Sequence, residues 1–89
     1  MSKTKEKQPI PKWFNGAIYD EGGWVRNPFS GDKYELNNIE LSIYDFIMGA
    51  TMVYERKGFN VDPKIVKDLR RGLDWFKKYN AEAYMVLLD

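Results

Sequence analysis

The stretch from Leu36 to Phe59 carries apolar residues at helical spacing on two opposite sides, and this feature limits the possible folds most. Asn37 can accept a hydrogen bond at the N-cap, and Glu40 follows three residues later, which is the spacing of a capping box. Gly58, which follows two basic residues, can end the helix. The pattern therefore predicts one helix of about six turns.

One apolar side of this helix predicts a core face, made of Ile39, Ile43, Phe46, Ile47, Ala50, Val53 and Tyr54. Nearly opposite lies a second apolar set, hereafter the second stripe, made of Leu41, Tyr44, Met48 and Met52. A helix at the surface of a small domain needs only one apolar side. We therefore expect either the rest of the chain or a second chain to cover the second stripe.

Two short segments with alternating polarity precede the long helix. They predict strands over residues 24–26 and 33–36, joined by a turn over residues 27–32, as an antiparallel ribbon. A ribbon of this size is marginal alone and needs the helix beneath it. We expect its aromatic side chains to pair across the strands and to cover one stripe of the helix.

A second amphipathic helix is predicted to begin after Asp62, with Pro63 in its first position, and to run to about Tyr79. Asn80 would fall at the centre of its core face, so the helix should break there. Asn80 could cap a short third helix, and a strand over residues 84–88 is the alternative.

The predicted fold class is α+β: a short antiparallel β-ribbon packed on a long central helix, an amphipathic second helix and a short C-terminal helix. One globular domain spans residues 13–89. Residues 1–12 carry four lysines against one glutamate and few apolar side chains, which predicts a disordered basic arm. The stiff Pro9-Ile10-Pro11 run would deliver Trp13 and Phe14 to the domain as an apolar clasp.

Composition argues against several functional classes. The 89 residues include no histidine and no cysteine, so the commonest general base, metal ligands and thiol nucleophile are missing. We expect no enzyme activity, no metal and no cofactor, with Asp45, beside the second stripe, as the one acid to follow. No apolar run is long enough for a membrane span, and the N-terminal residues lack a secretory apolar segment.

The second helix also presents a basic face, made of Lys64, Lys67, Arg70, Arg71, Lys77 and Lys78. This face suggests an alternative function as a nucleic-acid-binding accessory protein. The spacing also fits an ordinary solvated helix, because Asp68 and Asp74 stand four residues from Lys64, Arg70 and Lys78. We prefer the solvated face, because the net charge is only +1 and no recognised nucleic-acid motif is present.

Three runs of residues carry a resemblance to known proteins: 27–33, 40–50, and the end of the chain over residues 72–76 and 80–89. In these runs the chain resembles small uncharacterised proteins of marine phages of the myovirus type. The resemblance implies a phage-encoded protein that acts in the bacterial host cytoplasm or in the virion. It transfers no functional residue, because no activity is established for that group.

The preferred prediction is a non-enzymatic interaction or structural protein that forms a homo-oligomer or binds another protein. The predicted contact consists of Leu41, Tyr44, Met48, Met52 and Trp75, with the C-terminal apolar residues as further candidates. The alternative is that ribbon and second helix cover the second stripe within one chain. A domain of this length has little material to wrap both sides of its longest helix, so we prefer the oligomer.

Overall fold

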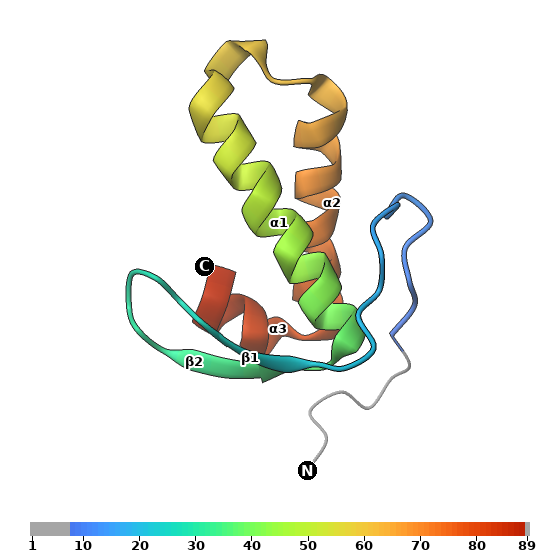
Figure 1. Ribbon diagram of the computed structural model, residues 1–89, viewed down its shortest axis with the longest axis vertical. Helices are drawn as coiled ribbons and strands as arrows, with labels where there is room; N and C mark the ends of the chain where they lie inside the picture. Colours follow the sequence, from blue (N-terminus) through green and yellow to red (C-terminus); the bar gives the residue numbers. More distant parts are fainter. Residues whose placement is uncertain (1–7, 89) are drawn as a thin grey trace.

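A two-stranded ribbon and a pair of antiparallel helices make up the computed structural model, which describes residues 8–88 (Figure 1). In chain order the elements are β1 (Gly23–Arg26), β2 (Lys33–Leu36), α1 (Asn38–Lys57), the 3-10 turn η1 (Gly58–Asn60), α2 (Pro63–Tyr79), α3 (Ala81–Ala83) and the π-helical turn η2 (Tyr84–Leu88). The predicted α+β class is confirmed, and the chain end is helical rather than a strand. Residues 1–7 of the predicted disordered arm, which was predicted over residues 1–12, lie outside the described residues.

Local capping explains where each helix begins. The Asn37 side chain accepts the backbone N–H of Glu40 at 2.8 Å, and the Glu40 carboxylate accepts the backbone N–H of Asn37 at 2.9 Å. The capping box is therefore present. Asp62 caps α2 by accepting the backbone N–H two residues later. Asn80 ends α2 and caps α3 by accepting the N–H of Ala83 at 3.2 Å, which is the predicted break.

The register of the ribbon decides which side chains face the helices. β1 and β2 are antiparallel, with Trp24 opposite Glu35 and Val25 opposite Tyr34. Tyr34 and Leu36 are buried, whereas Trp24 is 66% exposed. The expectation that aromatic side chains pair across the strands is therefore wrong for Trp24. Side chains alternate between faces, so a ribbon that buries Tyr34 and Leu36 must turn Trp24 and Glu35 outward.

Helices α1 and α2 pack closely at Gly72. A Cβ atom there would lie 2.9 Å from the Ile47 Cγ1 atom, so a larger residue would push the helices apart. The core extends from this crossing to the ribbon, and its four largest fully buried side chains are Phe76, Leu36, Ile43 and Ile47. The hydrophobic core thus includes residues of both helices and of β2.

Burial is uneven along the helix pair. We call residues 51–66 the distal end, and we call the base the rest of α1 and α2 together with the ribbon, α3 and η2. In α1 no residue after Ala50 is buried, and of the side chains described in the distal end only Val61 is buried. Figure 1 shows the two helices diverging away from the ribbon. Tyr54, predicted on the core face, is 48% exposed because it lies in this region.

Candidate functional site

The second stripe is divided between the base and the distal end. Tyr44 is buried in the hydrophobic core, and Leu41 and Met48 are half-buried against it. Leu41 lies beside the ribbon, because a Cβ atom on Gly23 would be 3.8 Å from its Cδ2 atom. Met52, one turn beyond Met48, is 62% exposed. The chain itself thus buries or partly covers the first three residues of the stripe and leaves the fourth in solvent.

Trp75, also predicted in the contact, is buried inside the chain. Its indole N–H donates a hydrogen bond to the carbonyl of Pro9 at 3.0 Å, and its ring packs against Phe76 and Tyr79. The N-terminal segment therefore holds the Trp75 indole. Together with buried Tyr44, this places two of the five predicted contact residues away from the surface.

The N-terminal segment also forms the predicted apolar clasp. The rings of Trp13 and Phe14 lie 6.0 Å apart, and each lies about 6 Å from the ring of Phe46, at 5.7 Å and 6.1 Å. A Cβ atom on Gly72 would lie 3.6 Å from the Trp13 Cη2 atom. The clasp therefore reaches both helices and stabilises the base.

The hairpin turn presents an aromatic side chain that the sequence did not single out. Phe29 is 97% exposed. Its turn is well fixed, since Asn27 accepts the N–H groups of Phe29 at 2.8 Å and of Ser30 at 3.2 Å. The Asn27 side chain also donates to the carbonyl of Val86 at 3.0 Å, which ties the turn to η2. An apolar residue within an otherwise polar turn is the only signal that could have identified Phe29.

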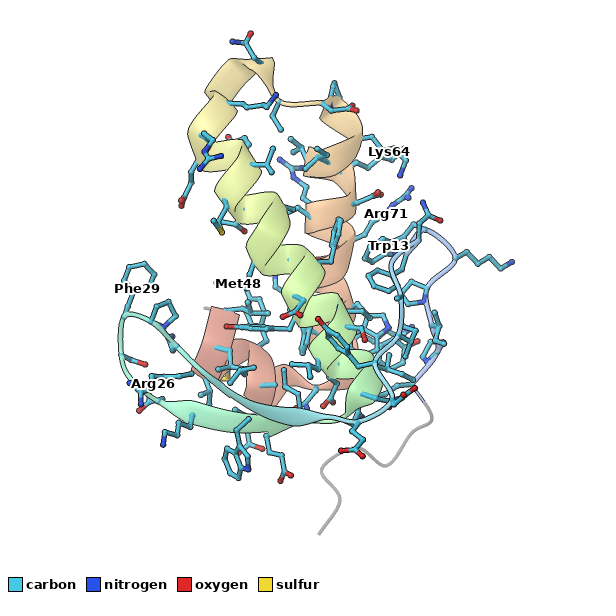
Figure 2. All side chains as sticks on the ribbon, viewed as in Figure 1. Trp13, Arg26, Phe29, Met48, Lys64 and Arg71 are labelled. Carbon is cyan, nitrogen blue, oxygen red and sulfur yellow. The ribbon has the colours of Figure 1, made fainter. Side chains whose placement is uncertain are left out.

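Gly49 lies between Met48 and Met52 on α1, and the chain provides no packing reason for it. It is exposed, and an added Cβ atom would meet nothing within 4 Å. A glycine inside a helix costs about 1 kcal/mol relative to alanine. Figure 2 shows Met48 on the side of α1 toward the hairpin tip, where Phe29 stands. The exposed Met52 side chain therefore lies next to Gly49, a position of α1 that has no side chain.

The basic face of α2 is exposed but largely engaged with neighbours. The Lys64 ammonium lies 2.6 Å from one Asp68 oxygen, and the Arg71 guanidinium lies 3.6 Å from the other. The predicted pair of Lys64 with Asp68 is confirmed. In the part of the chain that the structure describes, the predicted pairs with Asp74 are not formed.

The remaining cations of this face differ in surroundings. Lys77 lies 5.2 Å from the centre of the Tyr84 ring, and Lys78 lies 5.3 Å from that of Tyr79. Lys67 and Arg70 line an open hollow of about 460 Å³ between α1 and α2, together with Tyr54, Gly58, Val61, Pro63 and Val66. Only these two of the six predicted residues are without an ion pair or ring contact within residues 8–88.

A buried polar network joins the elements of the base. The carboxylate of Glu40, which is 3% exposed, accepts from the side-chain amides of Gln8 at 2.7 Å and Asn80 at 2.8 Å. The Tyr34 hydroxyl lies 3.0 Å from Glu82 Oε1 and 3.3 Å from Asn80 Oδ1. Burial, and next the Glu82 carboxylate, raise the pKa of Tyr34 to about 12. Because its members satisfy one another, the network is suited to holding the elements in place.

The acid that the sequence marked for attention, Asp45, is exposed. It accepts a hydrogen bond from the Tyr19 hydroxyl, and this bond raises the pKa of Tyr19. The backbone N–H of Tyr19 also donates to Ser42 at 2.9 Å, so the pair anchors the segment before the ribbon on α1. Across residues 8–88 no group of three or more histidine, cysteine or acidic side chains could hold a metal.

None of the helices described here combines the length and the apolar character needed to cross a membrane. Comparison with known proteins gives no further guide, because no protein-family model, curated protein or solved structure matches the chain.

Proposed function

We propose that this protein is a non-enzymatic interaction protein that forms a homo-oligomer through two features of its surface. The first is the α1 face that carries Met48, Gly49 and Met52, and the second is Phe29 at the hairpin tip. The observation that carries the proposal is that two large apolar side chains are exposed, Phe29 by 97% and Met52 by 62%. Apolar side chains that protrude from an ordered surface are typical anchors of protein contacts.

A two-fold arrangement would use both features at once. Phe29 of one copy would pack on the Met48–Met52 face of the other, and the reciprocal contact would form by symmetry. Gly49 provides room for the incoming ring, since the space over it is open in the single chain. Burial of one phenylalanine side chain contributes about 1.5–3 kcal/mol, and symmetry doubles that gain.

The fixed turn supports this role for Phe29. Its backbone is held by Asn27, and Asn27 is bonded to η2, so little conformational freedom is lost when the ring is buried. We propose that the oligomer acts in a phage-infected host cytoplasm or in a virion, following the resemblance to marine phage proteins.

Sedimentation velocity at protein concentrations from about 1 to about 100 μM tests the proposal. We expect the wild-type chain to associate and Phe29→Ser to remain a monomer with an unchanged far-UV circular dichroism spectrum. Met85→Ser is the matched control, because Met85 is 68% exposed but lies outside the proposed contact. A wild-type monomer across the whole range would contradict the proposal.

A further inference from the structure

The outer face of the β-ribbon carries a second feature that self-association does not use. Trp24 is 66% exposed on β1, and Arg26 is exposed two residues later on the same face. The register places Lys33 of β2 directly opposite Arg26. An open hollow of about 500 Å³ lies among these three side chains and Val25. Figure 2 shows Arg26 on the outer side of the ribbon and Phe29 on the side of the helices.

This arrangement does not serve the stability of the ribbon. Like charges that face each other across two strands destabilise the pair, and here Arg26 faces Lys33. Neither residue forms an ion pair in the part of the chain described, where Asp68 is the only acid in such a pair. The Trp24 indole contributes little to the stability of the fold, because it is mostly exposed and the hydrophobic core lies on the other face of the ribbon. An anionic ligand would relieve the repulsion between the two cations.

We propose that the outer face of the β-ribbon binds single-stranded nucleic acid, with one base stacked on Trp24 and the adjoining phosphates held by Arg26 and Lys33. Charge complementarity selects an anionic partner, and the exposed indole selects one that carries flat rings. Trp24 and Arg26 stand about 7 Å apart along the strand, which is comparable with the separation of a base from its own phosphate.

Sequence preference should be weak. The outer face offers an indole, two cations and Glu35, and base stacking on an aromatic ring tolerates every base. This site is also distinct from the basic face of α2, where four of the six cations already have a partner in the described chain. We therefore place the binding site on the outer face of the ribbon, and variants of the basic face of α2 serve as controls.

Fluorescence anisotropy of a labelled thymidine oligonucleotide of about 20 residues, measured at low salt, tests the proposal. Trp24→Leu should weaken binding about tenfold or more, while Trp24→Phe should retain most of it because a ring remains. Met85→Ala changes an exposed apolar residue on η2, outside the ribbon and outside the proposed self-association contact, and should leave the affinity unchanged.

Two further comparisons separate the roles of ring and charge. Reversing Arg26 and Lys33 to glutamate should reduce the slope of affinity against salt by about 1.4 for two lost phosphate contacts. An abasic strand of equal length should bind about tenfold more weakly than the thymidine strand, because it offers nothing to stack.

Three results would overturn the proposal. They are absence of binding at low salt, equal affinity for the abasic strand, and loss of binding on reversing Lys67 and Arg70 with no effect of the ribbon variants. The first removes nucleic acid as the ligand. The second removes stacking, and the third moves the site to α2. None of them bears on self-association, which is measured without nucleic acid.

Discussion

The base and the distal end of the helix pair are built from the same two helices but differ in what covers them. In the base, α1 buries Glu40, Ser42, Ile43, Tyr44, Ile47 and Ala50 under α2, the ribbon and the chain end. In the distal end the helices diverge, and exposed side chains include Met52 and Tyr54. The long helix is therefore a core element over its first half and an open surface over its second.

This difference explains why the second stripe had two competing interpretations. Helix α1 has 20 residues, whereas the elements that cover it on this side are two four-residue strands and the short chain end. These elements extend along only part of the helix. They reach Leu41, Tyr44 and Met48 but not Met52. The chain thus covers most of the second stripe itself, and the proposed contact with a second copy uses the exposed Met52 together with the half-buried Met48.

Truncating side chains in the base and in the distal end should give the largest difference between these regions in the free energy of unfolding. Phe76 is 0% exposed at the centre of the base, so Phe76→Ala should lower the free energy of unfolding by about 3–5 kcal/mol. Met52→Ala in the distal end should change it by less than about 0.5 kcal/mol in the monomer. Urea unfolding at low protein concentration measures both, and equal losses would show that the distal end is packed as tightly as the base.

The buried network should give the next largest effect. Glu40→Ala removes the acceptor of three hydrogen bonds and leaves the buried Asn80 amide without that partner. We expect a loss of about 2–4 kcal/mol in the free energy of unfolding. Glu55→Ala is the matched control, because Glu55 is an exposed glutamate on the same helix. Chemical denaturation that finds the two variants equally stable would argue against a structural role for the network.

Alkaline pH should weaken the base through Tyr34. Its pKa is raised from 10.0 to about 12 in the folded chain, so the unfolded chain loses the phenolic proton first as pH rises. This contribution is fully present below pH 10 and is lost between pH 10 and 12, by about 2 kcal/mol. The raised pKa values of Tyr19 and Tyr44 act in the same direction. Unfolding curves on both sides of pH 10 should show a smaller drop for Tyr34→Phe than for wild type.

Gly49→Ala should have the smallest effect, and it should stabilise the monomer while weakening self-association. Gly49→Ala should raise the free energy of unfolding of the monomer by about 0.5–1 kcal/mol, because the added methyl group meets open space. The same methyl group should weaken self-association by occupying the room left for Phe29. Thermal unfolding and sedimentation of one variant test both signs. Gains in both properties would indicate that no ring packs over Gly49.

Sequence reasoning located the elements because their signals are local. Asn37 and Glu40 form the expected capping box, Asp62 begins α2, and Asn80 breaks the helix where a polar residue would have entered the core. Each signal spans at most four residues, so it does not depend on how the chain folds over longer distances.

The roles that sequence reasoning missed depend on distant partners. Glu40 was identified as a cap, but its burial follows from Asn80, 40 residues away. Trp75 was predicted to contact a second chain, but its indole N–H donates to the carbonyl of Pro9, 66 residues away in the same chain. The outward position of Trp24 follows from a register set by the buried Leu36. No short-range pattern carries such information.

The central claim is that the chain covers most of its own base and leaves the Met48–Met52 face of α1 for a second copy. Hydrogen exchange measured at about 1 and about 100 μM protein tests this claim most directly. We predict that residues 48–57 and the hairpin tip at 27–32 exchange more slowly at the higher concentration, while residues 40–47 do not change. Exchange rates independent of concentration in every segment would contradict the claim.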